Sequence, residues 1–120
     1  MVKRVHEYNG IDMNSNDEVK FASHLDWMLV AGEIASWEYE TVTLDLAQNL
    51  KCKRTYCPDF IVTLPDGTDE IYEVKGWHKG RTSSIKVFEN AANLYCHIYN
   101  FYLVEWKTGG LSIKHYEGRR

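Results

Sequence analysis

Residues 56–77 read YCPDFIVTLPDGTDEIYEVKGW, and the expected fold is built around this stretch. Two runs rich in β-branched and aromatic residues, 56–64 and 71–77, flank a short polar segment, which is the pattern of two strands joined by a turn. In that segment Pro65, Asp66 and Gly67 follow one another, and each favours a turn for its own conformational reason. We therefore interpret Asp66 as a turn residue only.

The charged residues of these two strands are expected to meet on one surface. Side chains alternate between the faces of a strand, so Asp59 shares a face with Ile61, and Glu73 shares one with Lys75. The opposite face would carry the apolar residues Phe60, Val62, Leu64, Tyr72 and Val74. Pairing the strands brings Asp59, Glu73 and Lys75 together, and charged residues so close to a core need a chemical reason.

A divalent cation acting on a phosphodiester would be such a reason. Hard cations such as Mg²⁺ take carboxylate and carbonyl oxygens, so Asp59, Glu73 and the backbone carbonyl of Val74 would make an open metal shell. Lys75 would then orient or activate the attacking water and offset developing negative charge. The competing interpretation is a solvated ion pair on an exposed sheet face, which contributes little to stability.

Pro58-Asp59 followed by Glu73-Val74-Lys75 resembles the signature of the PD-(D/E)XK nuclease superfamily. The longer form, which adds Phe60 to the first motif and Gly76-Trp77 to the second, is similar to small phage nucleases of the endonuclease I kind, which resolve Holliday junctions and other branched DNA. The resemblance implies an α/β, restriction-endonuclease-like fold with an α-β-β-β-α-β core, in which helices flank a central mixed sheet. It also implies Mg²⁺ or Mn²⁺ as cofactor and a homodimer, because resolving a junction requires two cuts.

A capping box predicts the start of the first helix. Ser15 is followed three residues later by Glu18, which is the signature of a helix N-terminus, and Gly32 stands at a C′-like position after a helix that runs to about Ala31. Its apolar stripe consists of Phe21, Ala22, Leu25, Met28 and Leu29. Glu18 lies on the same inward stripe, at its N-terminal end.

Two roles for Glu18 compete. In the first, Glu18 only closes the capping box. In the second, it points over the sheet toward Asp59 and Glu73 and completes a metal site. The phage nucleases resemble this chain here as well, with a serine, two variable residues and a glutamate at the start of the first helix. The resemblance therefore implies that Glu18 is catalytic, and Glu38 and Glu40 are reserve candidates for the same role.

The remaining elements follow from periodicity and turn residues. An alternating run at 36–44 predicts the first strand, with Glu38 and Glu40 on its solvent face, and a polar connection at 45–55 leads into the second. Ser84 is suited to cap a second helix, whose inward stripe would be Ile85, Phe88, Ala91, Ala92 and Tyr95. Further strands are expected at 100–106 and 111–116, and Asn9-Gly10 is a turn signal. The order helix, three strands, helix, strand agrees with the core that the resemblance implies.

Basic residues flank the proposed carboxylates in the sequence. The candidate DNA-binding residues are Lys51, Lys53, Arg54, His78, Lys79, Arg81 and Lys86. Such clusters would suit a phosphate-binding rim around an acidic metal site. The alternative is solubility charge on loops. A loop histidine is more often simply exposed, so we expect no catalytic part for His78.

The composition indicates one globular domain spanning residues 1–120. A chain of 120 residues with 44% hydrophobic residues buries about two thirds of its unfolded surface, and no run approaches the roughly 20 apolar residues of a membrane span. Three irregularly spaced cysteines suit a reducing compartment, and we expect them to have packing roles. With no recognisable export signal, we expect a cytoplasmic protein, in the host cytoplasm if the chain is phage-encoded.

These observations together predict a Mg²⁺-dependent DNA endonuclease of phage DNA recombination or processing. Asp59 and Glu73 would hold the metal, Glu18 would add a carboxylate or water ligand, and Lys75 would position the nucleophile for in-line attack. One alternative is an endonuclease subunit similar to that of heteromeric transposases, which would need a transposase partner. The other is a DNA-binding or partner-inhibiting protein that has kept the fold without catalysis. The formal net charge of −3 argues against general nucleic-acid binding.

Overall fold

The computed structural model describes residues 6–46, 55–76 and 81–118 of the chain. These ranges contain the helices α1 (Asn16–Val30) and α2 (Arg81–Tyr95). The strands are β1 (Glu7–Tyr8), β2 (Ile11–Asp12), β3 (Ser36–Tyr39), β4 (Leu44–Asp45), β5 (Thr55–Tyr56), β6 (Phe60–Thr63), β7 (Asp69–Val74), β8 (Asn100–Lys107) and β9 (Gly110–Tyr116). The predicted α/β class is confirmed.

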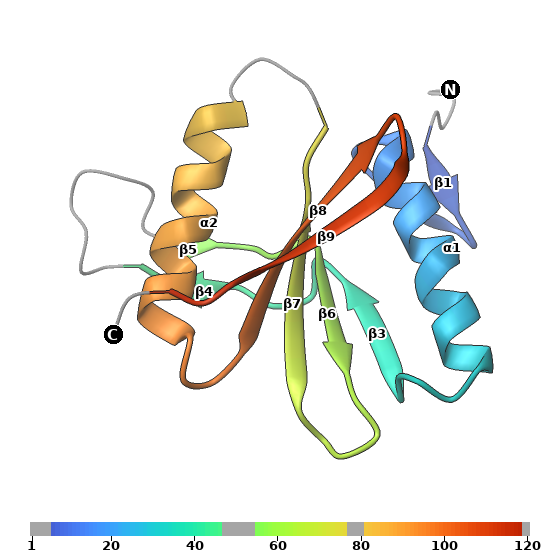
Figure 1. Cartoon of the computed structure of the whole chain (residues 1–120), viewed down its shortest axis with the longest axis horizontal. Helices are drawn as coiled ribbons and strands as arrows, with labels where there is room; N and C mark the ends of the chain where they lie inside the picture. Colours follow the sequence, from blue (N-terminus) through green and yellow to red (C-terminus); the bar gives the residue numbers. More distant parts are fainter. Residues whose placement is uncertain (1–5, 47–54, 77–80, 119–120) are drawn as a thin grey trace.

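Five strands form one mixed sheet in the order β3-β6-β7-β8-β9. β7 and β8 pair in parallel, and the other neighbouring strands pair antiparallel. Parallel neighbours need a crossover connection, and α2 lies in the crossover between β7 and β8 (Figure 1). The helices and the strands of this sheet follow one another as α1, β3, β6, β7, α2, β8 and β9, and the short strands β4 and β5, which the prediction did not include, lie between β3 and β6.

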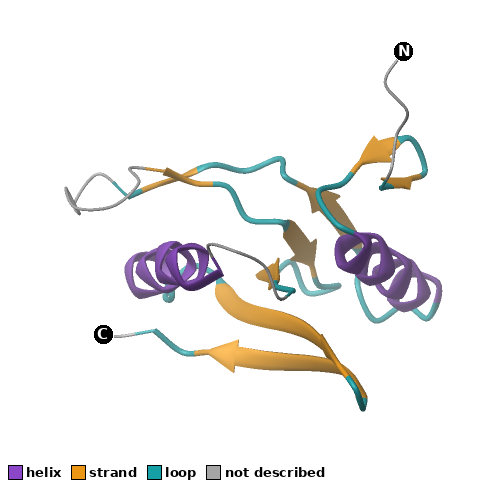
Figure 2. Ribbon diagram, turned by 90° about the horizontal axis from the view of Figure 1, so that it is seen from above, coloured by secondary structure: helices purple, strands orange, loops and turns teal. Residues whose placement is uncertain are grey.

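Each face of the sheet has its own apolar core, covered by one helix. On the α1 face, Phe21 packs with Phe60 and Tyr72, whereas on the α2 face Phe88 packs with Phe101. Alternation along the strands explains this division, because neighbouring residues of one strand point to opposite faces. Figure 1 and Figure 2 show the two helices on either side of the sheet.

Both ends of α1 depend on residues that the sequence identifies. Ser15 is the N-cap, and its Oγ accepts a hydrogen bond from the Glu18 N–H at 3.2 Å. At the other end Gly32 has a φ of +78°, and the Glu33 N–H donates to the Met28 carbonyl at 2.9 Å. This last contact is the long hydrogen bond of a Schellman motif, which satisfies a free carbonyl at the helix end. The predicted boundaries of α1 are therefore confirmed to within one residue.

Two predicted strands are shorter than expected. The strand predicted at 36–44 ends at Tyr39, because Glu40 has a φ of +53°, a left-handed conformation that interrupts the strand. The strand predicted at 56–64 is also interrupted, since β5 ends at Tyr56 and β6 begins only at Phe60. β4 and β5 instead pair with each other in a separate two-stranded sheet. Asp59 consequently lies just before β6 rather than within it.

The start of α2 and the N-terminal segment also differ from the expectation. α2 begins at Arg81, so Ser84 lies in its first turn and does not cap it. In the N-terminal segment β1 and β2 form a hairpin around Asn9 and Gly10, whose φ angles of +50° and +85° fit a type I′ turn. The sequence indicated this turn but not its strands, which are only two residues long each.

The turn before β7 and the two C-terminal strands agree with the predictions. Asp66 is exposed, and its Oδ1 accepts a hydrogen bond from the Thr68 N–H at 2.9 Å, as expected of a turn residue. β8 and β9 lie where the pattern places them. Within the described ranges, neither helix combines the length and apolar character that crossing a membrane requires.

The cysteines only partly fit the packing role predicted for them. Among the described residues, neither Cys57 nor Cys96 is part of a disulfide. Cys57 is exposed, because the chain leaves the sheet between β5 and β6, so the prediction is wrong for this residue. Cys96 is half-buried, and Cys52 lies outside the described residues.

Candidate active site

A cavity of about 450 Å³ lies where the start of α1 meets the end of β7. Its walls come from three separate segments of the chain and consist of Asn14, Ser15, Asp17, Glu18, Asp59, Val74, Lys75 and Gly76. A side-chain carbon added at Gly76 would come within 2.9 Å of Asp17 Oδ2. The chain leaving β7 therefore passes close to the first turn of α1, and a larger residue at position 76 would displace the Asp17 carboxylate.

Glu18 is held at this cavity by contacts beyond the capping box. Its carboxylate does not reach back to the Ser15 N–H, as a closed capping box requires. Instead Oε1 accepts hydrogen bonds from the Tyr39 hydroxyl at 2.5 Å and from the Asn14 N–H at 3.3 Å. The Glu18 side chain is 6% exposed and lines the cavity. The capping-box role alone therefore does not account for Glu18, because Tyr39 of β3 holds its carboxylate from outside the helix.

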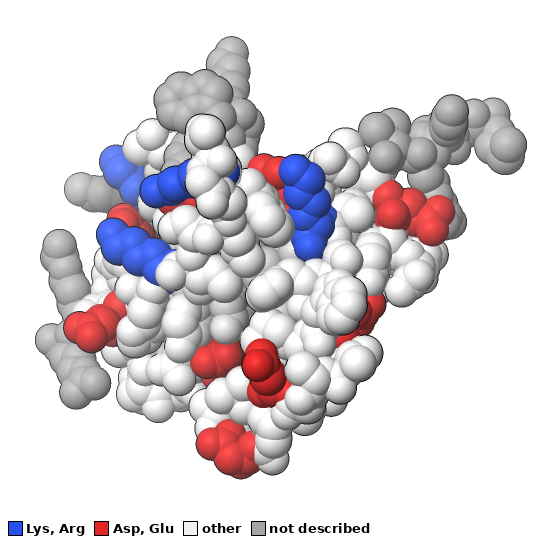
Figure 3. Space-filling view, turned by 45° about the vertical axis from the view of Figure 1, so that its right-hand side comes forward, with Lys and Arg blue, Asp and Glu red and all other residues white. Residues whose placement is uncertain are grey.

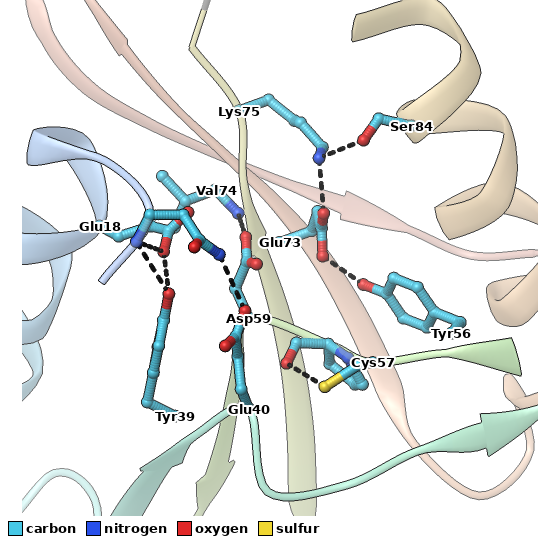
Figure 4. Close-up of polar contacts among 12 residues, drawn as sticks. Glu18, Tyr39, Glu40, Tyr56, Cys57, Asp59, Glu73, Val74, Lys75 and Ser84 are labelled. Carbon is cyan, nitrogen blue, oxygen red and sulfur yellow. Dashed lines mark hydrogen bonds and ion pairs between the residues drawn. The ribbon is translucent and has the colours of Figure 1, made fainter. Parts of the chain in front are cut away.

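Asp59 reaches the cavity from the residue that precedes β6. Phe60 pairs with Tyr72 in the β6–β7 register, so Asp59, one residue earlier, comes level with Glu73, one residue later. The carboxylate of Asp59 accepts a hydrogen bond from the Val74 N–H at 2.8 Å. This bond ties the aspartate to the end of β7 and orients it toward the cavity that Glu18 also lines (Figure 4).

Glu73 and Lys75 belong to a second group of polar contacts. Lys75 Nζ lies 2.7 Å from Glu73 Oε2 and donates to Ser84 Oγ of α2 at 2.7 Å. The other Glu73 oxygen accepts a hydrogen bond from the Tyr56 hydroxyl at 2.5 Å. Figure 4 shows the Glu73 side chain pointing toward Tyr56, on the opposite side of β7 from Asp59. Lys75 connects these contacts with the cavity, because it also lines the cavity wall together with Glu18 and Asp59.

Three buried acids surround one buried base at this site. Glu18, Asp59, Glu73 and Lys75 are each between 5% and 8% exposed. Burial raises the pKa of Asp59 well above its usual range, and the negative charges of Glu73 and Glu18 raise it further. Burial likewise raises the pKa of Glu18, although the hydrogen bond from Tyr39 acts in the opposite direction. The acids outnumber the base, so a bound cation would relieve an unfavourable concentration of negative charge.

The carboxylates nevertheless do not form a ready-made metal group. In the part of the chain that the structure describes, no set of three or more histidine, cysteine, aspartate or glutamate side chains is placed to hold one ion. Both oxygens of Glu73 are engaged, one by Tyr56 and one by Lys75. Glu18 and Asp59 line the cavity beside Val74, and their oxygen donors suit a hard cation. Glu73 is not on the cavity wall, contrary to the prediction that it shares one surface with Asp59, and it would have to leave a contact and turn toward the cavity to join them.

Most of the predicted DNA-binding residues lie outside the described ranges. This is the case for Lys51, Lys53, Arg54, His78 and Lys79, and for the side chain of Arg81. Lys86 is exposed on α2. Figure 3 shows one face of the molecule. The described lysine and arginine side chains on it gather in its upper half, and acidic side chains dominate its lower half. Positive charge is therefore unevenly distributed over this face of the molecule.

The two reserve carboxylates are exposed, as predicted, and lie in different surroundings. Glu40 accepts a hydrogen bond from Asn14 Nδ2 at 3.0 Å, and its charge contributes to the raised pKa of Glu18. Glu38 accepts one from the Thr41 hydroxyl at 3.0 Å and is not part of the cavity wall. Only Glu40 is therefore close enough to influence the site.

Three residues of the site carry no functional prediction from the sequence. Tyr39 and Tyr56 occur in runs that read simply as apolar strand, so nothing in the pattern indicates that their hydroxyls bind Glu18 and Glu73. Ser84 does carry a signal, because serine is a helix-capping residue, but its hydroxyl binds Lys75 instead. These partners come from other segments of the chain, and local periodicity does not contain them.

Comparison with protein families, with characterised proteins and with solved structures gives no match for this chain. Function is therefore inferred from the residues themselves: Asp17, Glu18, Asp59 and Lys75 on a cavity wall, and Glu73 paired with Lys75.

Proposed function

We propose that this protein is a metal-dependent DNA endonuclease that hydrolyses phosphodiester bonds. The observation that carries the proposal is the burial of three acids and one lysine close together: Glu18, Asp59 and Lys75 line one cavity, and Glu73 lies beside it, paired with Lys75. Buried acids are unfavourable unless they are paired, and one lysine cannot compensate three of them. A divalent cation would both balance the charge and supply the chemistry, which also accounts for the resemblance of the two motifs to PD-(D/E)XK nucleases.

Glu18, Asp59 and the Val74 carbonyl are the groups that would hold Mg²⁺ or Mn²⁺, with Glu73 as the further carboxylate. Such a cation, when bound, lowers the pKa of its water and stabilises charge on the phosphoryl oxygens. Lys75 lines the cavity, and its ammonium, held between Glu73 and Ser84, would turn toward the attacking water and orient it for in-line displacement. Tyr39 and the Val74 N–H hold the carboxylates of Glu18 and Asp59, so that little reorganisation is needed.

Branched DNA is the substrate class that we propose, and a homodimer the active form, on the strength of the resemblance to junction-resolving phage nucleases. The basic residues Lys51, Lys53, Arg54, His78, Lys79, Arg81 and Lys86 are proposed to contact the phosphates. Resolving a four-way junction requires two cuts, and two copies of a single active site would supply them.

The direct test is cleavage of a set of DNA structures. The protein would be incubated with four-way junction, flap, single-stranded and linear duplex DNA, each with Mg²⁺, Mn²⁺ or a chelator. We expect cutting that depends on the cation and is fastest on the junction. Cutting that is equally efficient in chelator would exclude the metal mechanism, and equal rates on all four substrates would exclude the preference for branched DNA. A requirement for an added transposase would favour the transposase-type subunit.

A second candidate is a DNA-binding or protein-binding member of the same fold that lacks catalysis. The engagement of both Glu73 oxygens favours it, because the described residues contain no complete metal group as they stand. The same assay separates the two functions. Tight binding of junction DNA without cutting in Mg²⁺ or Mn²⁺ would select the binding protein.

Binding of the cation itself should be visible as increased stability. A ligand that binds only the folded state at about 100 times its dissociation constant stabilises it by about 2.7 kcal/mol, so we expect Mn²⁺ to raise the Tm by several degrees. Thermal unfolding would be followed with Mn²⁺ and with NaCl of matched ionic strength. The response should disappear in Asp59→Asn and persist in Glu70→Gln, which alters a buried carboxylate bonded to Tyr72 and absent from the cavity wall. An unchanged Tm in Mn²⁺ would contradict cation binding.

A further inference from the structure

Ser84 is the contact through which α2 reaches the candidate active site. Its Oγ accepts a hydrogen bond from Lys75 Nζ at 2.7 Å. Building on the proposed nuclease function, we propose that Ser84 is a positioning residue that holds the Lys75 ammonium beside Glu73, next to the cavity, for phosphodiester hydrolysis. Neither the two motifs nor their resemblance includes this serine, which lies nine residues after Lys75 on another element.

The geometry of Lys75 explains why a second anchor is needed. A lysine side chain has a long flexible stem, and its ammonium has three donors that can rotate. Glu73, near the end of β7, binds this ammonium from two residues away in the chain. A pair so close in sequence fixes the distance between the two charges but leaves both side chains free to move together. Ser84 approaches from α2 and removes that freedom, because it belongs to a different element.

Glu73 is anchored in turn by Tyr56. The Tyr56 hydroxyl donates to Glu73 Oε1 at 2.5 Å, while Glu73 Oε2 lies 2.7 Å from Lys75 Nζ. The contacts form a continuous chain, Tyr56 to Glu73 to Lys75 to Ser84, that joins β5, the end of β7 and α2. Lys75 is therefore held between Glu73 and Ser84, and these two contacts leave one of its three ammonium donors for a water or a phosphate.

The surroundings of Ser84 favour this role over a purely helical one. A serine within a helix usually points to solvent or bonds the carbonyl one turn before it. Ser84 is half-buried and accepts from the lysine, whereas the adjacent Ser83 is exposed. Ser83 is thus a matched control, since it has the same side chain in the same helical turn without facing Lys75.

The test compares Ser84→Ala, Ser84→Thr and Ser83→Ala in junction cleavage with Mg²⁺. Misplacing a supporting contact typically lowers the rate by roughly 10- to 100-fold, and we expect this loss in kcat for Ser84→Ala with KM for DNA unchanged. Ser84→Thr, which keeps the hydroxyl, should recover most of the loss, and Ser83→Ala should behave as wild type. In a Lys75→Met background Ser84→Ala should have no further effect. A normal kcat in Ser84→Ala would overturn the proposal. So would a double variant in which Ser84→Ala lowers kcat by the same factor in the Lys75→Met background as in wild type.

A measurement without metal or DNA separates this inference from the proposed function. Proton–nitrogen NMR of protein labelled at the lysine side chains should show a slowly exchanging Lys75 ammonium in wild type and in Ser83→Ala. Ser84→Ala should broaden or remove that signal while leaving the Tm close to wild type. Wild-type protein that fails to cut any DNA would overturn the nuclease proposal and with it the catalytic purpose of Ser84. An unchanged ammonium signal in Ser84→Ala would overturn the positioning itself, whether or not the protein cuts DNA.

Discussion

Asp59→Asn is expected to reduce metal-dependent cleavage by about 10³-fold or more, because it removes a charged oxygen ligand from the cavity wall. The fold should survive the change. The Asp59 carboxylate accepts a hydrogen bond from the Val74 N–H at 2.8 Å, and the amide oxygen of asparagine can accept the same bond. The assay is single-turnover cleavage of junction DNA in Mg²⁺. Activity within a few-fold of wild type would remove Asp59 from the mechanism.

The same variant should be at least as stable as wild type at neutral pH. Burial, Glu73 and Glu18 raise the pKa of Asp59 in the folded protein above its value in the unfolded chain. The folded state then binds more protons in the window between the two pKa values, so the free energy of unfolding falls as pH rises through that window. Asparagine does not titrate, so the free energy of unfolding of Asp59→Asn does not fall in this window. Urea unfolding should show the stability difference near neutral pH, and the difference should vanish below the ordinary aspartate pKa of about 3.9.

The chain supplies its own control for Asp59. Asp66 also follows a proline, but it is exposed in the turn before β7, where the Thr68 N–H binds it at 2.9 Å. Asp66→Asn should leave both cleavage and the cation-induced rise in Tm unchanged. A loss of cleavage in Asp66→Asn as large as in Asp59→Asn would show that the assay reports a general effect on the protein and not the site.

Lys75→Met is expected to have two large effects. Removing the ammonium should lower cleavage by roughly 10²-fold or more, because the attacking water loses its charged partner. The variant should also lose about 3–5 kcal/mol of stability, since Glu73 remains buried with one oxygen unpaired. Urea unfolding and single-turnover cleavage below the unfolding transition measure the two effects separately. The exposed Lys114→Met on β9 is the control and should change neither.

A double variant separates the catalytic loss from the loss of stability. Lys75→Met combined with Glu73→Gln removes both charges of the pair, and the glutamine oxygen can still accept from Tyr56. We expect most of the stability to return while cleavage stays low. Cleavage that returns together with stability would show that Lys75 acts only through the fold.

Local chemistry explains which elements could be predicted from the sequence. Ser15 and Gly32 define the ends of α1 because the residues that cap a helix do so through their own side chain or backbone conformation. The turn at 65–67 and the strands β8 and β9 follow from equally local signals. The break after β3 could not be predicted in this way, because Glu40 adopts a left-handed conformation that is uncommon for glutamate.

The candidate site shows the same division between local and distant information. The two motifs predict Asp59, Glu73 and Lys75 as charged strand residues on one surface. All three are buried, but only Glu73 lies within a strand, and it is not on the cavity wall that Asp59 lines. Their partners could not be read from periodicity. Tyr56 lies 17 residues from Glu73, and Tyr39 lies 21 residues from Glu18. The sequence also predicts that Asp59 and Glu73 share one ion, whereas Glu73 is engaged by Tyr56 and Lys75.

The sequence by itself determined the α/β class, the order of the main elements, and the charged residues that stand apart from the apolar pattern. These properties depend on propensities and spacings within one segment, which act before the chain has folded. Only the tertiary structure decided that Lys75 is held between Glu73 and Ser84, and that Glu18 and Asp59 line the same cavity. The physical reason is that hydrogen bonds between segments depend on strand register and helix packing, and the whole folded chain sets both.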